Sequence, residues 1–176
     1  LRETAAMINL FRHDRLTGLY SKEFFYQKVR EVLTNNPEKE YDILCSDVVN
    51  FKLVNDIFGS QTGDQLLCIL ADTCRSYIAD DGLCGRLNAD QFICLKEHQA
   101  EYSDAEFAKI CEEASHQARL KNMVMKWGVY PVTDRSLSVE QMCDRAVLAA
   151  RSIKGQYGKY CAAYDDQLRS RLLREQ

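Results

Sequence analysis

The segment EYDILCSDVVNFKLVNDIFGSQTGDQLL, residues 40–67, determines the expected fold. Its first part, residues 40–49, is a dense apolar run interrupted by acids, which predicts a buried strand that ends near Asp47. Residues 50–63 predict a short helix and a turn, and residues 64–79 repeat apolar side chains at helical spacing. A buried strand that leads directly into helices is typical of an α/β domain.

Similar patterns continue on both sides of this segment. Ser21 fits the N-cap of the second helix, and Pro37 stops that helix. Helices are expected at residues 2–12, 21–36, 103–120, 138–153 and 165–176, strands at 122–132 and 161–164, and a hairpin at 83–95. Strands that alternate with helices, together with one hairpin, predict an α/β sandwich around a mixed sheet.

The hairpin contains GRLNADQF, residues 85–92, and carries an acid near its tip. Asn88 and Ala89 are expected in a two-residue turn, where both residues need positive φ and Asn-Gly is the usual choice. Asn tolerates that conformation, whereas Ala89 in the left-handed region would cost about 1–2 kcal/mol. The turn therefore raises the question of why glycine is missing here.

Two carboxylates are expected to meet beside this turn. Asp90 follows the turn and Asp47 ends the neighbouring strand, so adjacent central strands would bring both to one rim of the sheet. Facing carboxylates repel unless a cation or a proton lies between them. Mg²⁺ is commonly held by one or two carboxylates plus substrate phosphates. The alternative is that both are exposed turn acids.

Three polar residues lie close to these acids in the sequence, namely Lys52, Asn55 and Asp64. An amide offers a donor and an acceptor, and a carboxylate accepts from an amino group, so Asn55 and Asp64 could read a purine edge. The alternative is that both are helix caps, with Asp64 opening the helix that follows. Spacing alone does not separate the two interpretations.

The composition excludes several classes of protein. A net charge of −3 gives no electrostatic case for nucleic-acid binding. No apolar run approaches the roughly 20 residues that span a bilayer, and no signal-peptide pattern is present, so we expect a cytoplasmic protein without a membrane segment. Because the chain begins at Leu1 rather than Met and ends in a helical pattern, we expect it to be part of a longer protein.

The eight cysteines contain no CxxC pair and fall mostly in apolar patterns. Zinc sites with cysteine ligands usually show close ligand pairs. We therefore expect these residues to be small buried side chains in a reducing compartment. They are Cys45, Cys68, Cys74, Cys84, Cys94, Cys111, Cys143 and Cys161.

Five segments resemble, in order, the successive motifs of GGDEF domains, the diguanylate cyclases and their degenerate relatives in cyclic di-GMP signalling. They are DRLTGLYSKEFF (14–25), SDVVNFKLVNDIFGSQTGDQLL (46–67), GRLNADQFICL (85–95), KWGVY (126–130) and CDRAVLAAR (143–151). The resemblance implies a nucleotidyl-cyclase or polymerase-palm fold with a mixed, mostly antiparallel sheet flanked by helices. It also implies a GGDEF domain at 14–165, preceded by a linker helix at 1–13 and followed by the start of a second linker helix at 166–176.

The same resemblance implies roles for individual residues. In this family two domains face each other, each holds one GTP with Mg²⁺, and each 3′-hydroxyl attacks the other nucleotide's α-phosphate. Metal binding is implied for Asp47, Asp90 and the backbone carbonyl of Val48, and the catalytic positions are Asp90 and Gln91. Nucleotide contacts are implied for Asn50, Phe51, Lys52, Asn55, Asp64, Asn88, Ala89 and Arg151, and Arg86 matches the Arg that precedes the signature.

This chain departs from the family in its signature, where GGDEF is replaced by Asn88-Ala89-Asp90-Gln91-Phe92. Gln91 removes a carboxylate from the metal and hydroxyl chemistry, and Val49 replaces a second acid. We therefore expect a GTP-binding regulatory module that makes no cyclic di-GMP. A homodimer and a covalently linked EAL-type phosphodiesterase are expected partners, because the tail YDDQLRSRLLREQ resembles the connector of tandem GGDEF–EAL proteins. Two alternatives stay open: a diguanylate cyclase with weakened activity, and a structural dimerisation domain without nucleotide.

Overall fold

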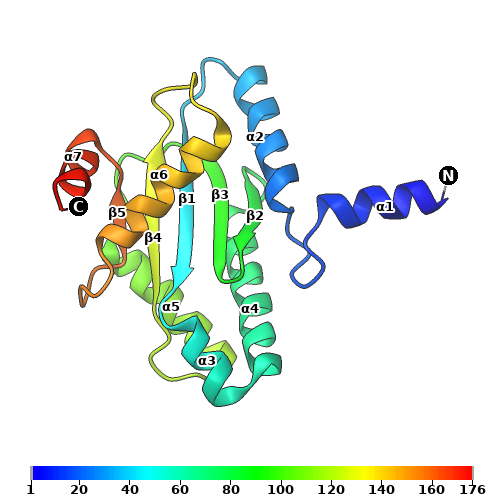
Figure 1. The fold of residues 1–176 in the computed structure, drawn as a ribbon, viewed down its shortest axis with the longest axis vertical. Helices are drawn as coiled ribbons and strands as arrows, with labels where there is room; N and C mark the ends of the chain where they lie inside the picture. The colour runs from blue at the N-terminus through cyan, green and yellow to red at the C-terminus, as the bar shows by residue number, and fades with distance from the viewer. Residues whose placement is uncertain (1, 176) are drawn as a thin grey trace.

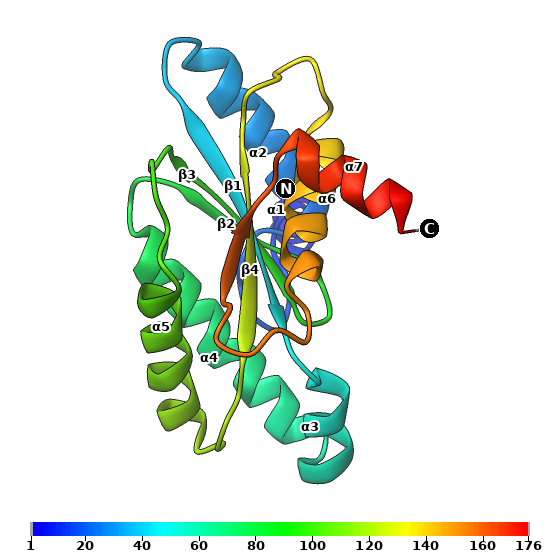
Figure 2. The same cartoon turned by 90° about the vertical axis from the view of Figure 1, so that its left-hand side faces the viewer.

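The computed structural model describes residues 2–175 and has one central sheet between two layers of helices (Figures 1 and 2). The strands are β1 (Tyr41–Val48), β2 (Leu83–Asn88), β3 (Gln91–Glu97), β4 (Met125–Pro131) and β5 (Cys161–Ala163). The helices are α1 (Arg2–Arg12), α2 (Lys22–Asn35), α3 (Phe51–Phe58), α4 (Ser60–Ile78), α5 (Asp104–Ala118), α6 (Val139–Ser152) and α7 (Asp166–Arg174).

The sheet has the strand order β2-β3-β1-β4-β5. All neighbouring strands are antiparallel except β4 and β5, which are parallel. The expected mixed, mostly antiparallel sheet flanked by helices is thus confirmed. Because β1 is central, its carboxyl end lies directly beside the hairpin formed by β2 and β3.

The two faces of the sheet bury separate apolar clusters, because successive strand residues point to opposite faces. Leu44 of β1 packs toward α4 and α5 with Phe107 and Trp127, whose rings stack at 4.5 Å between centroids. Ile43 belongs to the other cluster, which includes Phe25 of α2 and residues of α6. Figure 2 shows these two helix layers on opposite sides of the sheet.

Serine side chains open three of the helices. The N-cap hydroxyls of Ser21, Ser103 and Ser138 each accept a hydrogen bond from a backbone N–H in the first helical turn. Ser138 also forms a capping box with Gln141. The predicted helix starts are confirmed at these places, because a cap is a local signal that tertiary packing rarely overrides.

The short helix and the turn predicted within residues 50–63 are present, but the next helix begins four residues earlier than the predicted residue 64. Only Gly59 interrupts the helices, with φ of 90°, and α4 begins at Ser60. Glycine adopts this backbone without a steric penalty, so one residue is enough to redirect the chain. The first turn of α4 then continues into a helix whose Leu66 and Leu70 are buried, and this burial outweighs the weak helix propensity of residues 60–63.

The ends of the chain form separate helices. Figure 1 shows α1 projecting from the body of the domain, and Met7 and Phe11 on it are largely exposed.

Among the helices that the structure describes, none is both long and apolar enough to cross a membrane. All eight cysteines are free, and five of them are buried.

Candidate functional site

The two acids expected at one rim of the sheet do lie together. Asp47 is the penultimate residue of β1 and is paired across the sheet with Gln91, the first residue of β3. Asp90 directly precedes Gln91 in the turn of the hairpin. Burial, and then the neighbouring Asp47 carboxylate, raise the pKa of Asp90 to about 6. A raised pKa of this kind is expected for a partly buried carboxyl group that faces a second carboxylate with no cation between them.

A buried lysine lies on the other side of Asp47. Lys126 of β4 is the cross-strand partner of Asp47, so Gln91, Asp47 and Lys126 form a row across three strands on one face. The Lys126 side chain is 8% exposed, and its ammonium donates to the backbone carbonyls of Gln156, at 2.8 Å, and Lys159. Lys126 thereby links the loop that follows α6 to the strand beside Asp47. Sequence reasoning missed this residue, although a single lysine in an apolar strand was the available signal.

The turn of the hairpin differs from the expected one. β2 continues to Asn88, which pairs with Gln91, so the two turn residues are Ala89 and Asp90. None of these residues has positive φ. The register shifts between Arg86 and Asn88, and such an irregularity increases the local twist of a strand. The hairpin therefore closes without a left-handed residue, and the predicted strain at Ala89 is wrong.

Asn88 and Gln91, two polar residues that differ from the family signature, form a hydrogen bond with each other. The Asn88 amide donates to the Gln91 side-chain carbonyl at 2.7 Å, and Gln91 is 7% exposed. Gln91 is a neutral amide whose oxygen already accepts this hydrogen bond. It can neither take up a proton from a nucleotide hydroxyl nor supply the negative charge of a carboxylate.

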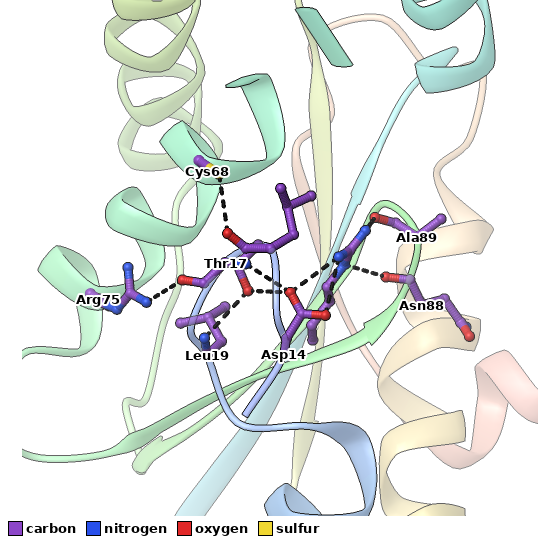
Figure 3. A network of polar contacts seen from close by, with 9 residues as sticks. Asp14, Thr17, Leu19, Cys68, Arg75, Asn88 and Ala89 are labelled. Atoms are coloured by element: carbon purple, nitrogen blue, oxygen red, sulfur yellow. Dashed lines mark hydrogen bonds and ion pairs between the residues drawn. The ribbon is translucent and has the colours of Figure 1, made fainter. Parts of the chain in front are cut away.

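A polar network anchors the hairpin to the loop before α2 (Figure 3). Both terminal oxygens of Asp14 accept from Arg86, at 3.2 and 3.1 Å, and the guanidinium also donates to the carbonyls of Asn88 and Ala89. Thr17 donates to the same carboxylate through its hydroxyl and its backbone. Burial alone would raise the pKa of Asp14, but the bonds from Thr17 and Arg86 outweigh it and lower the pKa. Arg86, which matches the Arg that precedes the family signature, thus holds the turn in place.

The candidate purine-reading residues lie where α3 meets α4. Asn55 belongs to the last two turns of α3 and Asp64 to the second turn of α4, so neither is a helix cap and that alternative is wrong. The Asn55 side chain lies against Gly63, where a Cβ atom would be only 1.8 Å from the Asn55 Oδ1. Phe51 is buried beside the same glycine. The absence of a side chain at Gly63 allows Asn55 to lie next to the start of α4.

Gly63→Ala is expected to separate nucleotide binding from stability. The family resemblance implies that Asn55 contacts guanine, and the added methyl group displaces its amide. The implied affinity for GTP should therefore fall about 10-fold, equivalent to one hydrogen bond of about 1.4 kcal/mol. Alanine favours the helix by up to about 1 kcal/mol, so the melting temperature should fall little or rise. Calorimetry and thermal unfolding measure the two effects. A parallel loss of both would contradict a specific role for Asn55.

The remaining expected residues lie on β1, at the start of α3 and near the end of α6. Val48 is the buried last residue of β1, and Asn50 caps α3 in the left-handed conformation, with φ of 58°. Lys52 is exposed in the first turn of α3, and Arg151 is exposed near the end of α6. None of these four residues contacts the two carboxylates through a described hydrogen bond or ion pair.

The donor set suits a magnesium ion only in part. Within residues 2–175 no group of three or more His, Cys, Asp or Glu side chains has the arrangement to hold a metal. Asp47 and Asp90 supply two carboxylates whose repulsion a cation would relieve. Mg²⁺ usually keeps several waters and completes its octahedron with phosphate oxygens. The residues therefore fit a magnesium ion that arrives together with a nucleotide.

A mostly antiparallel sheet between helices, with two acids at one rim, defines a palm-like α/β domain. Residues 11–159 match the family described as "Diguanylate cyclase, GGDEF domain". The chain belongs to the GGDEF family.

Several curated proteins are similar to this chain in sequence. A diguanylate cyclase of Vibrio cholerae is 33% identical over 94 residues, which make up 52% of this chain and 29% of that protein. The cyclic di-GMP phosphodiesterase NbdA of Pseudomonas aeruginosa is 28% identical over 157 residues, 85% of this chain and 20% of that protein. The chain thus spans less than a third of the length of these relatives.

The fold is also similar to that of solved GGDEF structures. The GGDEF domain of TpbB from Pseudomonas aeruginosa superposes with a TM-score of 0.73 at 24% sequence identity. The superposition covers 92% of this chain and 99% of that chain. At this level of identity the similarity establishes the fold.

Proposed function

We propose that this GGDEF domain binds GTP with Mg²⁺ but does not convert it to cyclic di-GMP, and that the bound state regulates an attached domain. The observation that carries the proposal is the pair Asp47 and Asp90, in which burial and the Asp47 carboxylate raise the pKa of Asp90 to about 6. A bound cation would stabilise this pair by relieving the repulsion between the two carboxylates. The cation in turn binds phosphates.

Loss of catalysis is supported by the residue next to these acids. Gln91 replaces a carboxylate of the family signature, and its side-chain oxygen is already bonded to Asn88. Removing one preorganised group that acts on a transition state commonly costs 10²-fold or more in rate, about 3 kcal/mol. Nucleotide affinity draws on many more contacts, including Asn55, Asp64 and Lys52, so binding is expected to survive the change.

A phosphodiesterase of the EAL type is the attached domain that we propose. One relative that matches 85% of this chain is named a cyclic di-GMP phosphodiesterase, and the match covers only 20% of that protein. Another relative is named a bifunctional diguanylate cyclase/cyclic di-GMP phosphodiesterase. At the C-terminal end, α7 buries Leu168 and carries Arg171 and Arg174 in its last turn, so it is a mostly solvated helix that suits a connector. The proposed function also includes the bound Mg²⁺ ion and a homodimer of this domain.

The second candidate function is a diguanylate cyclase with weakened activity. It is supported by the relatives named diguanylate cyclases and by the two acids, which both persist in this chain. A structural dimerisation domain without nucleotide is the third candidate.

One experiment separates these functions. The purified protein is incubated with GTP and Mg²⁺, cyclic di-GMP is followed by chromatography, and GTP affinity is measured in parallel by calorimetry. We expect binding that requires Mg²⁺ and prefers GTP to ATP, with no product. Product formed at ordinary turnover would establish the cyclase and refute the proposal. Absence of binding to either nucleotide would favour the structural domain.

A further inference from the structure

Three cysteine side chains gather beneath the hairpin, away from the two acids. Cys84 of β2 and Cys94 of β3 are cross-strand partners, and their Sγ atoms are 3.6 Å apart. The Cys84 thiol also contacts the backbone carbonyl of Cys74 in α4, at 3.5 Å. Hydrogen bonds with the thiols of Cys74 and Cys84 raise the pKa of Cys94. Within residues 2–175 these thiols belong to no group of side chains arranged to hold a metal.

The backbone places Cys84 and Cys94 at the closest spacing that a sheet offers. The Cys84 carbonyl accepts from the Tyr20 N–H, on the side of β2 that faces away from β3. In an antiparallel pair the N–H and C=O of one residue point to the same side, so Cys84 and Cys94 form a non-hydrogen-bonded pair. The Cα atoms of such a pair are about 4.5 Å apart, within the range that a disulfide bridges.

Small oxidants can approach one member of the pair from solvent. Cys84 is half-buried and lines an open groove of about 400 Å³ together with His13, Tyr20 and Leu83. Cys94 is 7% exposed and lies behind it. A half-buried cysteine beside a groove, with a second thiol in contact, is the arrangement of a reacting and a resolving cysteine.

We propose that Cys84 and Cys94 are a redox-modification site, which a peroxide converts to a cross-strand disulfide. The Cys84 sulfur attacks one peroxide oxygen, the O–O bond breaks, and water leaves, which gives a sulfenic acid on Cys84. The Cys94 sulfur then attacks that sulfur, the S–O bond breaks, and a second water leaves with the Cys94 proton. The two thiols lose two electrons, and the peroxide is reduced to two waters.

The disulfide would lock the hairpin that carries the nucleotide site. It joins β2 to β3 below the turn of Ala89 and Asp90 and closes a short loop. Because the buried Cys94 thiol loses its proton reluctantly, disulfide formation should accelerate as the pH rises from about 7 to 9. Oxidation should raise the melting temperature by about 5 °C.

Peptide mapping tests the proposal on the unmodified protein. Trypsin cleaves after Arg75, Arg86 and Lys96, so Cys84 and Cys94 fall in different peptides, 76–86 and 87–96, and Cys74 falls in a third. After treatment with hydrogen peroxide, alkylation and digestion without reductant, mass spectrometry should find 76–86 linked to 87–96. The link should disappear on reduction.

Two variants complete the test. Cys94→Ser should abolish the link and leave Cys84 as a sulfenic acid or a more oxidised form, whereas Cys68→Ser, a half-buried cysteine elsewhere on α4, should leave the link unchanged. A link between Cys74 and either partner, or peroxide-treated wild-type protein in which Cys84 and Cys94 both stay alkylatable, would overturn the proposal.

Discussion

Asp47→Asn is expected to reduce the proposed magnesium-dependent affinity for GTP by roughly 100-fold, or about 3 kcal/mol. The substitution keeps the shape of the side chain and removes a charge that raises the pKa of Asp90. With one carboxylate left, a bound cation loses a ligand and half of the opposing charge. Calorimetry with GTP at fixed Mg²⁺ measures the loss, and Asp81→Asn, an exposed acid before β2, is the matched control.

The same substitution should stabilise the metal-free protein. Asp90 has a raised pKa, so its contribution to stability is fully present below pH 3.8 and is lost as the pH rises through about 6. Asp47→Asn removes the repulsion that contributes to this loss. After allowance for solvent screening at a half-exposed group, we expect a gain of about 1 kcal/mol at pH 8 and almost none at pH 4.

Magnesium should reverse this difference. In wild-type protein, Mg²⁺ with GTP should raise the melting temperature at pH 8 and much less at pH 5, because protons compete with the cation for Asp90. In Asp47→Asn the rise should be small at both values. If the Asp47→Asn variant binds GTP and Mg²⁺ as tightly as wild type does, the two acids are not the metal site.

The sequence was sufficient to locate the main elements of the site. The apolar run that ends at Asp47 is a local pattern, and a hairpin that pairs beside it brings Asp90 to the same rim of the sheet. Both acids are therefore predictable from residues close to them in the chain. Resemblance to the GGDEF family then assigned the other positions.

Other features depend on contacts between distant segments, which local patterns do not contain. For Asn55 the sequence left both a purine-reading role and a helix cap open, because its packing against Gly63 belongs to the junction of two helices. Ala89 was expected to be strained because the sequence does not show the register shift between Arg86 and Asn88. That shift is a property of the paired strands. Lys126 was not predicted because its partners are carbonyls about 30 residues later in the chain. Such contacts become visible only when the chain is folded.

Arg86→Ala destabilises the protein by about 2–3 kcal/mol and lowers its melting temperature by about 5–10 °C. The side chains of Arg86 and Asp14 are only 17% and 22% exposed, so the substitution leaves a partly buried carboxylate without its cation. It also removes the hydrogen bonds that the Arg86 guanidinium donates to the carbonyls of Asn88 and Ala89. Arg86→Lys should recover less than half of the loss, because one ammonium cannot reach the carboxylate and both carbonyls together.

The pH dependence identifies the ion pair as the cause. The pKa of Asp14 is lowered in the folded protein, so its stabilising contribution is present above the unfolded value of 3.8 and is lost as the pH falls through the folded value. The difference between wild type and Arg86→Ala should therefore shrink below about pH 4. Hydrogen exchange should accelerate first in β2 and β3, and GTP affinity should fall even at saturating Mg²⁺, because Asp90 lies on the loosened turn. Equal destabilisation at pH 3 and pH 7, with unchanged exchange in the hairpin, would assign Arg86 to general packing instead of to holding the turn.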